Sequence, residues 1–482
     1  MSPVRTPARQ RRFALSMAAA VGALVLSGCA SVNFDNALAT TNREAADFTQ
    51  GQLQLALTSE QKSQHAQHAA KLLGQPLSQS DAVQLALVNS PALQALMAQS
   101  WADAAGAAQA GRIANPILTL ERSTTLDEVE LSRVLSFGLL DLLTLPLRKG
   151  MAERGIARAQ LQLTADVIDH VTQVRQAWVK AVAGQQNLRY AQQVNDTAEV
   201  SADLARRMQA VGNITKLQRA RQQVFYADAA SQWATAQHNA AATRETLVRM
   251  LGLDAAQSQQ LQLPERLPDL PSTPRSPQDV SQAANAGRMD IKLARAALEG
   301  SAKAQGLNRI TSLTDIELGI RRDTMTDGHT GESTARHAVE VSLKLPVFDF
   351  GDLRRDAMQA QTLAHAHRLE ATVRSAGSNL RETYSAYRTA WDVARHYRDE
   401  VVPLRKLIVE ESVLRYNGMI GSIFELLADS KDQVSSVMAA IATEEQFWLA
   451  DAALQAAQIG RPTMASVGAI PTTAAGGNDA AH

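Results

Sequence analysis

Two pairs of histidines come closest, in residue type and spacing, to a metal-binding pattern. His65 and His68 are three residues apart and would share one face of a helix, whereas His365 and His367 are two apart and would not. Neither pair has a cysteine or a cluster of carboxylates beside it that would complete a set of ligands. The chain also has no glycine-rich phosphate loop and no Gly-x-Ser-x-Gly nucleophile motif. We therefore expect no metal site, no bound cofactor and no enzymatic activity.

Cys29 is the only cysteine, and its position in the sequence indicates its chemical role. Several arginines precede an apolar run over 13–26, which is too short for a stable membrane-spanning helix. The run ends in Leu26-Ser27-Gly28-Cys29, which resembles the signal of bacterial lipoproteins, where small residues precede a cysteine that is acylated. This resemblance implies a signal peptide over 1–28 and a covalent lipid, with palmitate among its chains, on Cys29. Ala30 stands where some lipoproteins carry aspartate, and its presence goes with the outer membrane.

The composition favours a large, mainly helical protein. Of the 482 residues, 45% are hydrophobic and 20% are charged, which is enough to bury a core and argues against disorder. Aromatic residues make up only 4%, and 26 glycines and 15 prolines are modest numbers, so long helices are favoured over a sheet-rich globule. Because 48 basic residues balance 48 acidic residues, we expect no nucleic-acid partner.

The chain contains two copies of one plan. Leu-Thr-Leu-Pro-Leu at 143–147 recurs as Leu-Lys-Leu-Pro-Val at 343–347. The first repeat is expected over 79–262 and the second over 278–460, and a proline-rich linker over 263–277 should be extended.

Two terminal segments flank the repeats. Residues 29–78 form a lipid-anchored N-terminal segment, and 461–482 form a tail rich in Ala, Thr and Gly that we expect to be disordered. We expect mobility over 30–75 as well.

Each repeat is predicted to follow the order helix, strand, strand, long helix, turn, long helix. The first helix of the chain should be interrupted near Asn89-Ser90-Pro91, and Pro403 should kink a later one. Val167, Val171 and Val174 follow the spacing of a supercoiling seam. The expected helices cover 79–111, 148–210, 277–307 and 352–415, and the expected strands cover 117–121, 129–145, 314–321 and 337–345.

The strand over 337–345 alternates between apolar and polar residues. Val339, Val341 and Leu343 would lie on one face, with Glu340 and Ser342 on the other. A strand that faces lipid on one side and water on the other needs this pattern. Four strands cannot close a barrel, because bacterial outer-membrane barrels need about eight or more, so several chains would have to share one. The long helical hairpins would then form a second tube, and the predicted object is a conduit.

These features resemble the TolC-like outer-membrane efflux protein family, and especially its lipoprotein branch. The resemblance covers about 79–460 and is carried by Asn89-Ser90-Pro91-Ala92-Leu93, the two Leu-x-Leu-Pro corners, Phe348-Asp349-Phe350-Gly351 and the turn motifs at 211–221 and 416–427. It implies a fold that is mainly α with a small β part, in which long antiparallel helical hairpins form an α-barrel. Each chain would add four strands to a trimeric 12-stranded transmembrane β-barrel.

The resemblance also implies a function. The chain would be the outer-membrane channel of a tripartite efflux or export system, lipid-anchored in the cell outer membrane with a large periplasmic portion. Its partners would be two further copies of itself in a homotrimer, a periplasmic adaptor protein, an inner-membrane pump and outer-membrane lipid.

The candidate site residues lie at the turns between the long helices. By resemblance, Glu425 and the nearby Asp429 would form an acidic ring at the periplasmic entrance gate, which would favour cations. A solvated helix position is the other interpretation of Glu425. The hairpin tips, where the adaptor would dock, include Gly212, Asn213, Lys216, Tyr416, Gly418 and Gly421.

A second function of another class remains open. The chain could be an outer-membrane lipoprotein that tethers periplasmic partners through its coiled coils and forms no channel. This alternative predicts strands that are polar on both faces. The segment 129–145, with Arg133 and Asp141 inside an apolar run, does not alternate cleanly.

Overall fold

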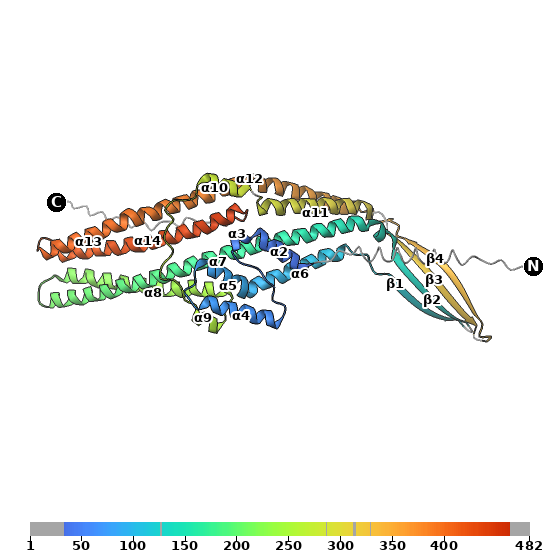
Figure 1. The fold of residues 1–482 in the computed structure, drawn as a ribbon, viewed down its shortest axis with the longest axis horizontal. Coiled ribbons are helices and arrows are strands. Elements are labelled where there is room, and N and C mark those ends of the chain that lie inside the picture. Colours follow the sequence, from blue (N-terminus) through green and yellow to red (C-terminus); the bar gives the residue numbers. More distant parts are fainter. Residues whose placement is uncertain (1–32, 126–127, 286, 312–314, 328, 463–482) are drawn as a thin grey trace, which may run out of the picture. The chain divides into compact units, whose positions relative to one another are not determined.

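The computed structural model describes residues 33–125, 128–285, 287–311, 315–327 and 329–462 (Figure 1). The predicted signal peptide, Cys29 and nearly all of the predicted tail lie outside these residues.

The two repeats have the predicted order of elements. Each contains a pair of helices, a pair of strands and a long helical hairpin (Figure 1). In the first repeat the elements are α5 (Gln79–Asn89), α6 (Pro91–Ala110), β1 (Ile117–Thr125), β2 (Glu128–Gly138), α7 (Leu139–Ala210) and α8 (Lys216–Leu251). In the second they are α10 (Pro277–Asn285), α11 (Met289–Thr311), β3 (Ile316–Asp327), β4 (Ser333–Leu343), α12 (Asp352–His396), the π-helical turn η1 (Tyr397–Val401), α13 (Val402–Asn417) and α14 (Ile423–Gln458).

The chain divides into two compact units that do not coincide with the repeats. Each unit takes segments from both repeats, and the boundaries fall within α6, α7, α11, α12 and the N-terminal helix α2 (Phe34–Glu44). Among the described residues, the first unit comprises 33–37, 99–125, 128–162, 292–311, 315–327 and 329–372, and contains the sheet. The second comprises the described residues of 38–98, 163–285, 287–291 and 373–462, and contains both turns between the long helices.

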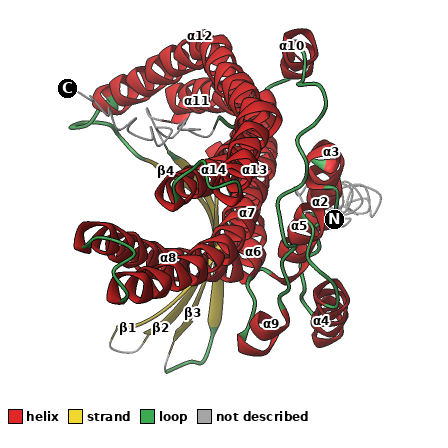
Figure 2. Ribbon diagram, turned by 90° about the vertical axis from the view of Figure 1, so that its left-hand side faces the viewer, coloured by secondary structure: helices red, strands yellow, loops and turns green. Residues whose placement is uncertain are grey.

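The sheet has four antiparallel strands in the order β1-β2-β3-β4. The two repeats meet at its centre, where β2 pairs with β3 and Leu135 lies opposite Ile320. Within the described residues, β1 and β4 each have only one neighbouring strand, so the sheet has two open edges. Figure 2 shows the strands in yellow and the helices in red.

The predicted seam of α7 is buried in the second unit. Val167, Val171 and Val174 have no exposed surface, and Trp178 is 2% exposed. The Trp178 indole N–H donates to the carbonyl of Leu77 at 2.8 Å. No described helix combines the length and the apolar character that crossing a membrane requires.

The predicted irregularity at Pro403 takes the form of a π-helical turn. The residues just before this proline, Tyr397–Val401, form η1, and α13 begins at Val402. Proline has no N–H to continue the α-helical bonding pattern, and π turns accommodate such breaks. The break at Ser90 is also present, because α5 ends at Asn89 and α6 starts with Pro91.

The strand predicted over 129–145 is wrong beyond Gly138. Residues from Leu139 onward form the first turns of α7, so Pro146 and the first Leu-x-Leu-Pro motif are helical. Leucines at 139, 142 and 143 also suit one face of a helix. Asp141 lies in the first turn, where a negative charge is favourable, and forms an ion pair with Arg148 at 2.7 Å.

The described part of the N-terminal segment is helical. It forms α2 (Phe34–Glu44), α3 (Ala46–Thr49) and α4 (Ser59–Leu73). In the second unit, the guanidinium of Arg175 on α7 donates to the carbonyl of Phe48 at 2.5 Å and lies 4.4 Å from the centre of its ring. This contact holds the segment on α7.

The proline-rich linker packs closely on the second unit. Residues 261–276 form neither helix nor strand, although α9 (Ala255–Gln260) precedes them. The carbonyls of Pro268 and Pro271 accept hydrogen bonds from the indole N–H groups of Trp448 and Trp391, both at 3.1 Å.

Candidate functional site

The turn between α7 and α8 is built by a glycine and a helix cap. Gly212 has a φ of +82°, a conformation that favours glycine, and the Asn213 N–H donates to the carbonyl of Met208 at 2.9 Å. The Thr215 hydroxyl accepts from the N–H of Gln218 and so caps α8, in which Lys216 is the first residue. This turn is the first tip.

The turn between α13 and α14 is built differently. Gly418 ends α13 with a φ of −77°, and the left-handed position falls on Met419, whose φ is +57°. The N–H of Gly421 donates to the carbonyl of Arg415 at 3.1 Å, and a Cβ at Gly421 would lie 3.2 Å from the Cβ of Arg415. Gly421 therefore serves the close return of the chain. This turn, which also includes Tyr416, is the second tip.

The acidic residues near the second tip are bound to the partner helix of their own hairpin. They are spaced by four and then three residues, which places them along one stripe of α14. Glu425 accepts from Arg415 at 3.1 Å, Asp429 accepts from the hydroxyl of Ser412, and Asp432 accepts from Arg405 at 3.0 Å.

The two predicted gate acids therefore differ in their surroundings. The Glu425 side chain is 46% exposed and its partner Arg415 is 54% exposed, so solvent screens this ion pair. Asp429 is partly buried against Ser412. Arg415 and Ser412 were not predicted as partners of these acids, although the spacing of the acids indicates a shared helix face.

Both tips expose apolar side chains. Val211 and Leu217 at the first tip are 72% and 62% exposed, and Met419 and Ile420 at the second are 95% and 77% exposed. Tyr416 is 41% exposed. Clustered exposed apolar side chains are typical of protein interaction sites.

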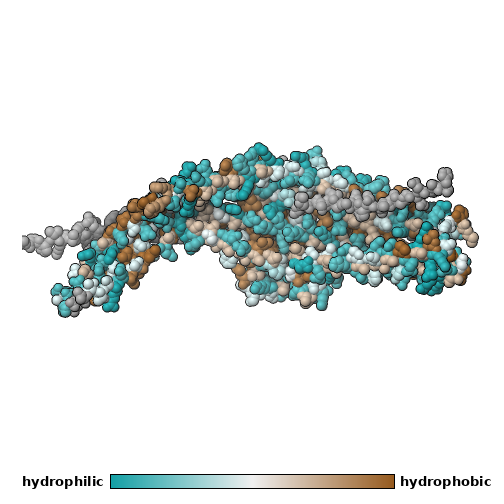
Figure 3. Space-filling view, turned by 180° about the vertical axis from the view of Figure 1, so that it is seen from behind, coloured by the Kyte–Doolittle hydropathy of each residue, from teal (hydrophilic) through white to brown (hydrophobic). Residues whose placement is uncertain are grey.

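One side of the sheet carries most of its large apolar side chains. One row runs across all four strands through Leu118, Leu135, Ile320 and Val339, and these side chains are 42–72% exposed. Figure 3 shows apolar side chains gathered over part of the strands and polar ones at the far end of the strand hairpins. We call the side of the sheet that carries this row the apolar face, and the opposite side the polar face.

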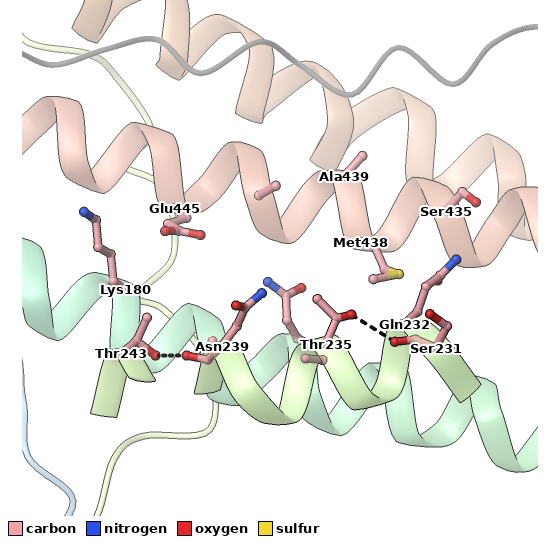
Figure 4. A pocket seen from close by; sticks show the side chains of 14 residues that line it. Lys180, Ser231, Gln232, Thr235, Asn239, Thr243, Ser435, Met438, Ala439 and Glu445 are labelled. Carbon is pink, nitrogen blue, oxygen red and sulfur yellow. Dashed lines mark hydrogen bonds between the residues drawn. The ribbon is translucent and has the colours of Figure 1, made fainter. Parts of the chain in front are cut away.

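A cavity of about 640 Å³ lies between α7, α8 and α14 (Figure 4). Its titratable lining residues are Lys180 and Glu445, from α7 and α14. Burial raises the pKa of Glu445, and the charge of Lys180 partly offsets this effect. The hydroxyls of Thr235 and Thr243 donate to carbonyls within α8.

The histidine pairs lie on separate helices. His65 and His68 are on α4, where His65 Nε2 lies 3.4 Å from Gln54 Oε1 and burial lowers the pKa of His65. His365 and His367 are on α12. Across the described part of the chain, no three His, Cys, Asp or Glu side chains are grouped so as to hold a metal ion.

Solved structures of outer-membrane proteins share this fold. The outer membrane protein VceC of Vibrio cholerae has a TM-score of 0.64 at 15% identity, covering 83% of this chain and 97% of its own. The CmeC outer membrane channel of Campylobacter jejuni has a TM-score of 0.66 at 14% identity, covering 86% and 90%. The MtrE outer membrane channel of Neisseria gonorrhoeae has a TM-score of 0.62 at 17% identity, covering 82% and 91%.

The chain shares the fold of these proteins, which is mainly helical with a four-stranded antiparallel sheet, as predicted. Residues 280–407 match the family model described as outer membrane efflux protein, so the predicted resemblance to that family is confirmed. The match extends from α10 into α13. No curated protein matches the chain in sequence.

Proposed function

We propose that this protein is the outer-membrane channel of a tripartite efflux or export system. Three copies would form a homotrimer in which their sheets join into one 12-stranded barrel, and the helical hairpins would extend into the periplasm. A periplasmic adaptor and an inner-membrane pump would deliver solutes to the hairpin tips. Acyl chains on Cys29 would add a lipid anchor.

The row Leu118–Leu135–Ile320–Val339 carries this proposal. Four large apolar side chains side by side on an uncovered sheet face are unfavourable in water and suit the hydrocarbon of a bilayer. The tether alternative predicted strands that are polar on both faces, and this row contradicts that prediction.

The open edges of the sheet support assembly with further copies. Unpaired N–H and C=O groups are costly in a bilayer, so β1 and β4 need partners there. Because strands alternate in direction, β4 of one copy would be antiparallel to β1 of the next. Three sheets of four strands then supply twelve, above the minimum of about eight.

The tips are the proposed docking and gating elements. Exposed Val211, Leu217, Met419 and Ile420 offer apolar contacts to an adaptor. Glu425 would contribute to an acidic entrance ring, with its charge moderated by Arg415.

The channel is tested by measuring single-channel conductance of the purified mature protein in a planar bilayer, together with its oligomeric mass in detergent. We expect a trimer that gives discrete openings. A folded monomer without conductance would contradict the shared barrel and favour a tether.

The gate assignment is tested separately, by ion selectivity. Glu425→Gln should lower the preference for cations, because it removes a carboxylate and leaves the charge of Arg415 uncompensated. Arg415→Gln should raise that preference. Glu410→Gln is the matched control, since Glu410 forms its surface ion pair with Lys406 on α13. Unchanged selectivity in a conducting Glu425→Gln channel would refute the gate role and leave the channel proposal intact.

A further inference from the structure

The charges of the sheet are divided between its two faces. In the described strands, the apolar face carries cationic side chains but no carboxylate, as the strand alternation and register require. The carboxylates of the strands, Glu121, Glu128, Glu130, Glu317, Asp323, Asp327 and Glu340, all belong to the polar face.

Two arginines and one histidine stand in one row across the sheet. Arg133 on β2 lies opposite Arg322 on β3, which lies opposite His337 on β4. Arg122 on β1 is the diagonal neighbour of Arg133 on the same face. We call these four residues the cation row.

The cation row lacks acidic partners in the described part of the chain. The Arg133 guanidinium donates to the neutral hydroxyl of Thr324 at 3.3 Å. Like charges directly opposite each other on neighbouring strands are destabilising, so Arg133 and Arg322 repel unless an anion lies between them. The arrangement therefore calls for an anion from outside the chain.

A second copy of the chain cannot supply that anion from the equivalent surface. The apolar face of another copy carries the same cations and no strand carboxylate, so two such faces would repel. The carboxylates of the polar face are on the other side of the same sheet. A ligand of different chemistry is needed.

The position of the row indicates which ligand it would meet. On β4, His337 is followed on the same face by Val339, Val341 and Leu343, about 20 Å along the strand at 3.3 Å per residue. In the other direction along β4, toward the strand hairpin, the residues on the apolar face are Ala335 and Ser333. The cations thus border an apolar band, at the level where lipid phosphates lie.

We propose that the cation row binds the phosphate groups of an outer-leaflet lipid that carries more than one phosphate. Guanidinium groups bind phosphate oxygens in paired hydrogen bonds, and the adjacent apolar band would contact the acyl chains of the same lipid. This inference rests on the proposed function, because it requires the strands to cross the outer membrane with the strand hairpins outward. A homotrimer would present the row three times.

The test is the affinity of the purified trimer, in neutral detergent, for diphosphoryl lipid A, measured by native mass spectrometry. Each cation near an anionic surface contributes about fivefold, so Arg133→Gln/Arg322→Gln should weaken binding roughly 25-fold. Arg133→Lys/Arg322→Lys keeps the charges and should restore most of it. Arg336→Gln is the matched control, because Arg336 adjoins His337 on β4 but belongs to the polar face.

Two further arms separate the lipid from other anions and from the channel itself. Inorganic phosphate should not displace the lipid, because it lacks acyl chains, and zwitterionic phosphatidylcholine should bind equally to all variants. The Arg133→Gln/Arg322→Gln trimer should still conduct. Unchanged lipid A affinity in that conducting variant, or full displacement by inorganic phosphate, would overturn this inference alone. Loss of trimer and conductance in the unaltered protein would overturn the proposed function.

Discussion

An arginine placed on the apolar face of β4 should destabilise the protein far more than an arginine one residue away. Val341 is 63% exposed and lies opposite Leu318, between Val339 and Leu343. Ser342 belongs to the polar face and lies opposite Glu317. We compare Val341→Arg with Ser342→Arg, which add the same side chain to the same strand.

The magnitude follows from the solvent that each face meets. On a lipid-facing strand, arginine costs about 2–4 kcal/mol at the bilayer midplane. That cost corresponds to a change of roughly 30- to 700-fold in the folding equilibrium. Ser342→Arg gains a cross-strand partner in Glu317, so its effect should stay within about 1 kcal/mol.

The assay is urea-induced unfolding of the protein reconstituted in phosphatidylcholine vesicles, followed by the loss of trimer. We expect a lower midpoint for Val341→Arg and a midpoint near that of the unaltered protein for Ser342→Arg. In a sheet that faces water on both sides, an exposed valine can be replaced at little cost. Equal midpoints for the two variants would therefore refute the assignment of the faces.

Three other outcomes follow from single residues. Mass spectrometry of the mature unaltered protein should find acyl chains, including palmitate, on Cys29, and Cys29→Ala should remove that mass. An unmodified Cys29 in the mature protein would contradict the signal assignment. Trp178→Phe should lower the free energy of unfolding by about 1–3 kcal/mol, because the carbonyl of Leu77 loses its donor. Trp233→Phe should lower it less, since the Trp233 indole N–H has no partner among the described residues. Burial raises the pKa of Glu445 in the folded state. The unaltered protein therefore loses stability as pH rises from the pKa of Glu445 in the unfolded state through its pKa in the folded state. The melting temperature of Glu445→Gln should accordingly be higher than that of the unaltered protein at pH 8, but not at pH 4.

The long elements could be predicted because their signals are local. The spacing of Val167, Val171 and Val174 identified a buried helical seam, and Pro91 marked the start of α6. The repeat identified the paired strands. Their register could not be predicted, since the pairing of Leu135 with Ile320 joins segments far apart in the chain.

Other parts of the fold were missed because two local signals competed or none was strong. The leucines after Gly138 fit a strand by hydrophobicity and a helix by spacing, and Asp141 with Arg148 favours the helix. The N-terminal helices carry weak signals of their own. Arg175, more than a hundred residues further along, bonds to Phe48, and this tertiary contact helps to hold the segment.

The candidate site shows the same division between local and tertiary information. Turn chemistry at Gly212 is local, and its φ of +82° agrees with the prediction of a turn. At the second tip the left-handed residue is Met419 and not a glycine, so residue type alone does not indicate where that conformation falls.

The two tips differ in the charge that they would present to a partner protein. At the second tip, Glu425 and Asp429 each have a partner on α13, so their negative charge is partly compensated or buried within the hairpin. At the first tip, Lys216 and Arg221 follow the turn closely, and α8 has no acidic residue in its first turn. An adaptor that docks to both tips would therefore meet a basic surface at one and a nearly neutral, apolar surface at the other, and its complementary residues should differ accordingly.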